Sequence, residues 1–216
     1  VHAVGNLANL RAAVEKAADG NGEAAAETGI AHTRWATHGR VTEENAHPHD
    51  DSTGKVHIVL NGIVENHAEL RRRLIAEGED FSSETDAEVV AHLIAHHYDG
   101  DLAAATRAAY ADLRGHYAFV AMHADEPGRL VGARKECPLV AGVGAGETFL
   151  ASAIPAFLAD TRVAVPIENG ELVEIEAGGV RITDTEGNPI EREPEEVRER
   201  AAHHRRSPLF FFCCSE

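Results

Sequence analysis

Residues 29–39, with the sequence GIAHTRWATHG, place an arginine, an indole ring, two hydroxyls and two imidazoles close together. The apolar start predicts a strand and the polar, glycine-terminated end predicts a loop, which is how a rigid sheet presents side chains to a small ligand. Arg34 suits a carboxylate, because its planar guanidinium donates two parallel charge-assisted hydrogen bonds. Each residue alone would more often be an ordinary strand end or turn, but together they indicate a binding site.

Part of this stretch closely resembles a motif of one enzyme family. HTRWATHG at residues 32–39 looks like the glutamine-loop signature of the glutaminase domain of glutamine:fructose-6-phosphate aminotransferases (glucosamine-6-phosphate synthases). Three further segments match that family in the same order: NAHPH at residues 45–49, NGIVEN at residues 61–66 and SETDAE at residues 83–88. The resemblance runs from about residue 4 to about residue 197, so it covers most of the chain.

The resemblance implies hydrolysis of the side-chain amide of glutamine with release of ammonia, and it implies no cofactor. Free glutamine must then be held at its α-carboxylate and α-ammonium, and the oxyanion formed from its amide must meet preorganised donors. Arg34 matches the residue that binds the α-carboxylate in the family. Trp35, Thr37 and His38 would shape the loop that closes over glutamine.

The other two motifs supply the remaining groups that the resemblance implies. Asp86 would hold the α-ammonium, although the helix dipole alone also favours an acidic residue in a first helical turn. Asn61 and Gly62 would form the oxyanion hole, through the asparagine amide and the glycine N–H. Asn-Gly is also a common turn, but this pair directly follows the apolar run at residues 56–60, which is expected to form a strand, as is the run at residues 30–35. The family usually has a histidine before this asparagine, where the chain has Leu60.

The family's nucleophile is an N-terminal cysteine whose own α-amino group acts as the general base. No segment of this chain matches that region, so we expect the chain as written to have no glutaminase activity alone. Cys137 is internal and is better interpreted as a half-buried thiol at a strand end. Ala153 is a further departure, at a position where the family commonly has aspartate.

Two alternative functions stay open beside the glutaminase domain. One is a non-catalytic glutamine-binding pseudoenzyme that kept the pocket and lost the nucleophile. The other is a different class II amidotransferase, such as amidophosphoribosyltransferase, against which the TRWATH and SETD segments argue. In the family the expected partners are L-glutamine, a C-terminal sugar-phosphate isomerase half and a second subunit in a homodimer, and we expect the isomerase half to be absent here.

Composition favours an ordinary globular protein in the cytoplasm. The chain has 216 residues, of which 44% are hydrophobic and 26% charged. A formal net charge of -16 argues against nucleic acid and anionic membranes as partners. Three cysteines make no disulfide framework, no apolar run approaches the length of a membrane span, and the start lacks a secretory pattern. The 14 histidines lack ligand spacing, so we expect no metal site, and His47 and His49 are interpreted as groups that fix a loop.

The periodicity of apolar residues predicts helices first and hairpins afterwards. Helices are expected over residues 7–18, from Asn66 to about Gly78, from a capping box of Thr85 and Glu88 onward, and over 102–113. The later expected strands cover residues 117–123, 130–133, 139–143, 149–151, 162–165, 172–175 and 180–183. This order is typical of α+β with antiparallel sheets.

The resemblance implies a more specific architecture. It is a four-layer α/β/β/α sandwich of the N-terminal-nucleophile hydrolase type, here expected to lack its first strand and helix. One amidotransferase domain is expected over residues 1–190. Residues 191–216 are expected to form a charged exit segment and a tail that matches no family sequence and lies outside the fold.

Overall fold

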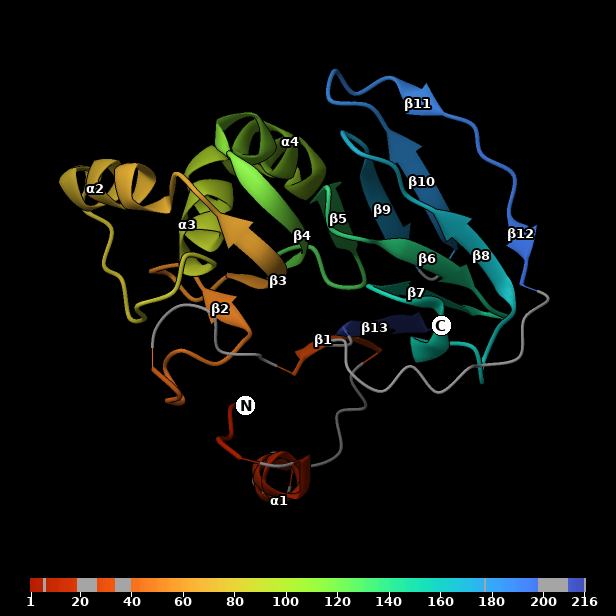
Figure 1. Cartoon of the computed structure of the whole chain (residues 1–216), viewed down its shortest axis with the longest axis horizontal. Helices are drawn as coiled ribbons and strands as arrows, with labels where there is room; N and C mark the ends of the chain where they lie inside the picture. Colours follow the sequence, from red (N-terminus) through yellow and green to blue (C-terminus); the bar gives the residue numbers. More distant parts are fainter. Residues whose placement is uncertain (6, 19–26, 34–39, 177, 198–209, 216) are drawn as a thin grey trace.

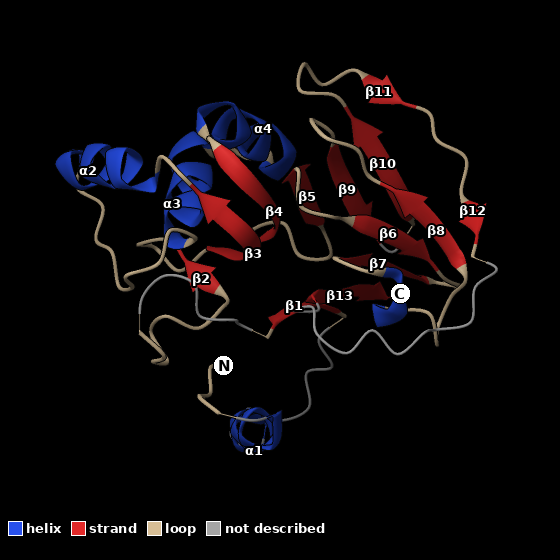
Figure 2. Ribbon diagram, in the orientation of Figure 1, coloured by secondary structure: helices blue, strands red, loops and turns tan. Residues whose placement is uncertain are grey.

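Short, alternating apolar segments form two antiparallel sheets. The computed structural model describes residues 1–5, 7–18, 27–33, 40–176, 178–197 and 210–215, the last range by its backbone. Among these residues, one sheet has seven strands in the order β11-β10-β9-β5-β4-β3-β2, and the other has six in the order β1-β13-β7-β6-β8-β12 (Figure 1). Figure 2 shows three of the helices beside the seven-stranded sheet and the first helix apart from them. The predicted α+β class with antiparallel sheets is confirmed.

The strands have the following bounds. The seven-stranded sheet contains β2 (His49–Asp50), β3 (Val56–Val64), β4 (Gly115–His123), β5 (Leu130–Lys135), β9 (Leu172–Glu176), β10 (Gly179–Thr183) and β11 (Pro189–Ile190). The six-stranded sheet contains β1 (Thr28–His32), β6 (Val140–Val143), β7 (Glu147–Ala151), β8 (Val163–Pro166), β12 (Glu195–Glu196) and β13 (Phe210–Ser215). The seven strands expected after residue 115 are therefore all present, with shifts of one or two residues at their ends.

In the described part of the chain, four α-helices accompany the sheets: α1 (Leu7–Ala18), α2 (His67–Glu77), α3 (Glu88–His97) and α4 (Leu102–Asp112), with a 3-10 turn η1 (Ile154–Ala156). The Asp101 side chain caps α4 by accepting hydrogen bonds from two backbone N–H groups of the first turn. Gly78 ends α2 in the left-handed conformation, with φ 106°. In Figure 1, α1 lies beyond β1, away from the other three helices.

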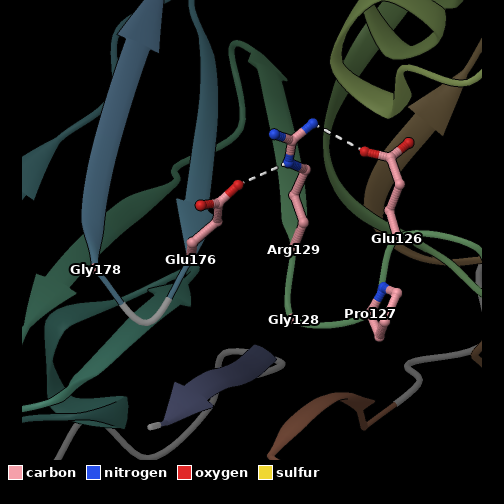
Figure 3. A pocket seen from close by; sticks show the side chains of 6 residues that line it. All are labelled: Glu126, Pro127, Gly128, Arg129, Glu176 and Gly178. Atoms are coloured by element: carbon pink, nitrogen blue, oxygen red, sulfur yellow. Dashed lines mark hydrogen bonds and ion pairs between the residues drawn. The ribbon is translucent and has the colours of Figure 1, made fainter.

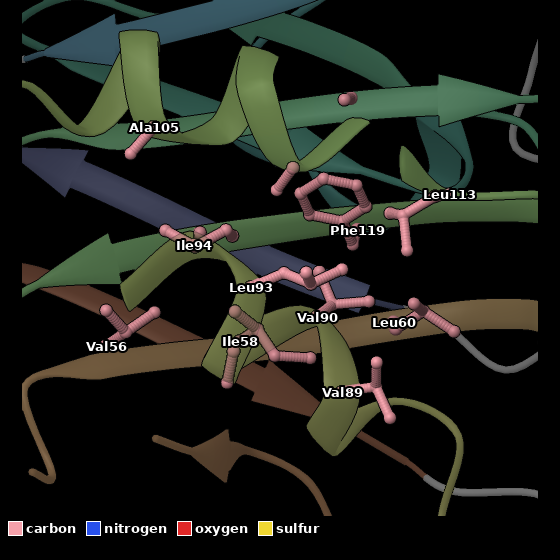
Figure 4. Packing of buried hydrophobic residues seen from close by; sticks show 14 of the residues in the cluster. Val56, Ile58, Leu60, Val89, Val90, Leu93, Ile94, Ala105, Leu113 and Phe119 are labelled. Atoms are coloured by element: carbon pink, nitrogen blue, oxygen red, sulfur yellow. The ribbon is translucent and has the colours of Figure 1, made fainter. Parts of the chain in front are cut away.

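The seven-stranded sheet buries both of its faces, because successive side chains of a strand point to opposite sides. On one face, Ile58 and Leu60 of β3 pack with Val90 and Leu93 of α3 (Figure 4). The apolar residues Val89, Val90, Leu93 and Ile94 of α3 are all buried.

The opposite face of the seven-stranded sheet packs against the six-stranded sheet. Val59 and Val120 belong to one buried cluster with Leu150 of β7 and Val165 of β8. Asn61 follows Val59 by two residues in β3, so its side chain starts on this inter-sheet face. Among the helices that the structure describes, none combines the length and apolarity needed to cross a membrane.

The predicted capping box at the start of α3 is wrong. The residue before the helix is Ala87, in a helical conformation, and no side chain caps the first turn. The Glu88 carboxylate instead accepts hydrogen bonds from the N–H and hydroxyl groups of Ser82 and Ser83. The same glutamate therefore fixes the preceding loop, which offers it four donors.

The expectation that the C-terminal tail lies outside the fold is also wrong. The backbone of β13 pairs with β1 on one side and with β7 on the other, and β12 pairs with β8. Two neighbouring strands thus supply partners for the N–H and C=O groups of β13, which the irregular sequence of the tail did not indicate. The boundary at residue 190 stays a prediction.

Candidate functional site

The oxyanion-hole candidates lie inside β3 rather than in a turn after it. Asn61 pairs with Ala118 and Gly62 with Tyr117, and the strand continues to Val64. The predicted strand at residues 56–60 is therefore correct but too short. Asn61 is half-buried and Gly62 is exposed at the end of the strand that holds them.

Both the backbone conformation and the close neighbours of residue 62 require a glycine there. Its φ is +96°, a region that residues with a Cβ rarely adopt. A Cβ would lie 2.0 Å from the carbonyl oxygen of His116 and 2.8 Å from Cys137 Sγ. The Cys137 thiol therefore packs against Gly62, a contact that no local sequence pattern indicates. Burial raises the pKa of this thiol, which disfavours the nucleophilic thiolate.

Asp86 lies next to the end of the same strand. Its side chain is only 5% exposed, and Oδ2 accepts a 2.7 Å hydrogen bond from the N–H of Val64. Because Val64 is two residues after Gly62, this bond brings the start of α3 to the oxyanion-hole candidates. The structure thus places together two motifs that are more than 20 residues apart in the sequence.

The loop before α3 is fixed by a buried ion pair. Glu88 is 1% exposed and His92 is fully buried, with His92 Nε2 3.8 Å from Glu88 Oε1. Burial opposes ionisation of Glu88, but the nearby His92 imidazole and the hydrogen bonds from Ser82 and Ser83 outweigh it and lower the pKa of Glu88 to about 2. Burial likewise opposes the charge on His92, but Glu88 and Glu79 raise its pKa. The charged pair holds the loop that leads to Asp86.

Three imidazoles connect the NAHPH segment to Asn61. His32 Nε2 lies 3.4 Å from Asn61 Oδ1, and the ring centroids of His32 and His47 are 4.0 Å apart. His47 contacts His49 edge to face at 4.6 Å, and His49 Nε2 lies 3.1 Å from Thr85 Oγ1. These contacts agree with the interpretation of His47 and His49 as groups that fix a loop near the site.

The remaining predicted site residues lie outside the described part of the chain. Arg34, Trp35, Thr37 and His38 all fall within residues 34–39. The structure does describe His32, which ends β1 two residues before Arg34 and contacts Asn61. The glutamine-loop motif therefore starts beside the oxyanion-hole candidates.

A surface pocket of about 440 Å³ lies elsewhere, between the β4–β5 and β9–β10 turns. In Figure 3, Arg129 lies between Glu126 and Glu176 and forms an ion pair with each. The β4–β5 turn follows His123, which pairs with Val56 at the opposite end of β3 from Gly62. This pocket is thus separate from the predicted site. Among the described residues, no three His, Cys, Asp or Glu side chains are grouped to hold a metal ion.

Comparisons with known proteins agree with these motifs. A family described as "Glutamine amidotransferase domain" matches residues 32–159. A glutamine--fructose-6-phosphate aminotransferase [isomerizing] from Methanothermobacter thermautotrophicus is 52% identical over 171 residues, covering 78% of this chain and 29% of the relative. The protein of the same name from Streptomyces coelicolor is 53% identical over 169 residues, covering 77% and 28%. The chain thus spans less than a third of these curated relatives.

Among solved structures, the glutamine phosphoribosylpyrophosphate amidotransferase from B. subtilis superposes with a TM-score of 0.61 at 26% identity. The match covers 73% of this chain and 35% of that one. The family match includes His32, Asn61, Gly62 and Asp86, and it extends over more than half of the sequence. The chain belongs to the glutamine amidotransferase domain family.

Proposed function

We propose that this chain binds L-glutamine at the end of β3 and is the domain that releases ammonia for making glucosamine 6-phosphate from fructose 6-phosphate. The observation that carries the proposal is the hydrogen bond between Asp86 Oδ2 and the N–H of Val64. It supports the proposal because it holds the buried Asp86 carboxylate near the end of β3, close to Asn61 and Gly62, the groups proposed for the oxyanion.

Each group has a distinct task in the proposed reaction, in which glutamine and water give glutamate and ammonia. The Asn61 amide and the Gly62 N–H donate to the oxygen that becomes negative when the amide carbonyl is attacked. Asp86 Oδ1 accepts from the α-ammonium, while Oδ2 keeps its bond to the backbone. Arg34 binds the α-carboxylate through two parallel hydrogen bonds. Trp35, Thr37 and His38 complete the loop over the ligand.

The attacking nucleophile in this proposal is the N-terminal cysteine that the family resemblance implies. Cys137 is not proposed for that task, because burial raises its pKa and keeps the thiol protonated. The proposal also includes a cytoplasmic location and a homodimeric full-length protein, in which a sugar-phosphate isomerase half consumes the ammonia.

The synthase proposal is favoured over an amidophosphoribosyltransferase. Curated relatives named as the fructose-6-phosphate enzyme are about half identical to the chain, whereas the phosphoribosylpyrophosphate amidotransferase is 26% identical. A glutamine-binding pseudoenzyme would share the same pocket, so it is distinguished by activity rather than by binding.

Isothermal titration of the chain with a small set of amino acids tests the proposal. We expect saturable binding of L-glutamine and much weaker binding of L-asparagine and D-glutamine, because the amide and ammonium contacts fix both length and chirality. Equal binding of all three, or no binding of L-glutamine, would contradict the proposed site. A full-length protein that binds L-glutamine but releases no ammonia would identify the pseudoenzyme instead.

A further inference from the structure

The side-chain amide of Asn61 is held from the opposite sheet. His32 is the last residue of β1 in the six-stranded sheet, and Asn61 lies in β3 of the seven-stranded sheet. His32 Nε2 and Asn61 Oδ1 are 3.4 Å apart. This contact joins the strand that leads into the glutamine-loop motif to the strand that carries the oxyanion-hole candidates.

The direction of this hydrogen bond decides what Asn61 can offer to a ligand. An asparagine amide has an oxygen that accepts and a nitrogen that donates, and the two ends have nearly the same shape. When His32 carries its proton on Nε2, it donates to Oδ1 and leaves Nδ2 to face the other way. An unprotonated Nε2 would attract Nδ2 instead and turn the carbonyl oxygen toward the ligand. A carbonyl would repel an oxyanion that an N–H group stabilises.

The surroundings of His32 keep its ring in this position. Its ring contacts that of His47 at 4.0 Å and an interplanar angle of 38°. His47 in turn contacts His49, which is 3% exposed and lies 3.1 Å from Thr85 Oγ1. The imidazole that faces Asn61 is thus supported from the loop that precedes Asp86.

We propose that His32 is a positioning residue, which donates from Nε2 to Asn61 and so keeps the Asn61 N–H groups directed at the carbonyl oxygen of the substrate. This inference rests on the proposed function, because it assigns to Asn61 the donor role in glutamine hydrolysis. His32 itself acts through Asn61.

Nuclear magnetic resonance of the full chain tests the bond without any ligand. The ¹⁵N shifts of the His32 ring distinguish a protonated Nε2 from a protonated Nδ1, and Asn61→Asp assigns the Asn61 side-chain signals. We expect a protonated Nε2 in the wild type. His32→Gln should preserve the Asn61 signals, because a glutamine amide nitrogen reaches about as far as Nε2, whereas His32→Ala should shift them. His57→Gln, at the other end of β3, is the matched control that should leave them in place.

Titration with L-glutamine then measures the effect on binding. Loss of one oriented hydrogen bond should weaken binding in His32→Ala by about two- to tenfold, with His32→Gln close to the wild type. His32→Ala combined with Asn61→Ala should bind no more weakly than Asn61→Ala alone, since His32 acts through Asn61.

The two proposals fail in different ways. An Nε2 without a proton, or Asn61 signals that stay unchanged in His32→Ala, would overturn the role of His32 whether or not glutamine binds. Fully additive effects of the two alanine substitutions would also overturn it. A wild-type chain with the expected His32 spectrum and no L-glutamine binding would contradict the proposed function alone.

Discussion

Substitution of Gly62 by alanine should be far more damaging than its exposed position in the sheet indicates. The backbone of Gly62 has φ +96° and pairs with Tyr117 of β4. The new Cβ would lie 2.0 Å from the backbone oxygen of His116, much closer than van der Waals contact allows. Since that oxygen belongs to the paired strand, it can move only if β3 and β4 separate locally.

The expected loss of stability in Gly62→Ala has two parts. A residue with a Cβ in a left-handed conformation costs roughly 1–2 kcal/mol. Forcing a methyl group into filled space typically costs a further 1–3 kcal/mol or so. The free energy of unfolding of Gly62→Ala should therefore fall by about 2–5 kcal/mol, a large share of the total for a domain.

Gly78→Ala is the matched control that separates these two parts. Gly78 has φ +106°, close to that of Gly62, but a Cβ there meets nothing within 4 Å. Its substitution should cost only the conformational part, roughly 1–2 kcal/mol. Urea unfolding followed by circular dichroism gives both values. Equal destabilisation by the two substitutions would refute the inferred close approach of β4 to Gly62.

Three further predictions follow from the contacts around the site. Glu88→Gln should destabilise the chain most above about pH 4.5, because the pKa of Glu88 is lowered to about 2 in the folded state. The difference from wild type in the free energy of unfolding, measured in urea, should reach up to about 3 kcal/mol and shrink as the pH falls toward 2. A pH-independent difference would contradict the ion pair. Asn66→Ala removes hydrogen bonds to the Asp112 oxygen and from the Arg114 N–H, both 2.9 Å, and should cost about 1–3 kcal/mol in the same assay. Deletion of residues 210–216 should lower the melting temperature, since β13 pairs with both β1 and β7; an unchanged melt would show that these strands do not depend on it.

The helices and most strands could be predicted from the sequence because their signals are local. The apolar period of α3 and the glycine after α2 lie within the elements that they define. The extension of β3 through Asn61 and Gly62 could not, because Asn-Gly is a strong turn signal and only the pairing with β4 keeps these residues in a strand. The capping box predicted for Glu88 does not form, because Ser82 and Ser83 of the preceding loop compete with the helix start for the same carboxylate.

The candidate site was predicted as a set of residues, but its internal contacts depend on tertiary structure. The resemblance to a known family indicated Asn61, Gly62 and Asp86 with no reference to distance. The bond from Val64 to Asp86, the packing of Cys137 on Gly62 and the contact of His32 with Asn61 each join segments that are far apart in the chain. Such contacts are set by the stacking of the two sheets, which no local pattern encodes.

Isothermal titration of L-glutamine into the wild type, Asp86→Asn and Asp51→Asn tests the central claim most directly. Asparagine at position 86 can still accept from the Val64 N–H, but it lacks the charge that pairs with an α-ammonium. Asp51 is a matched control, because it is also buried and accepts backbone hydrogen bonds, at the far end of β3. We predict saturable binding to the wild type and Asp51→Asn, and at least tenfold weaker binding to Asp86→Asn for a loss of about 1.5–3 kcal/mol. Equal affinity of Asp86→Asn and the wild type would contradict a glutamine site at the end of β3.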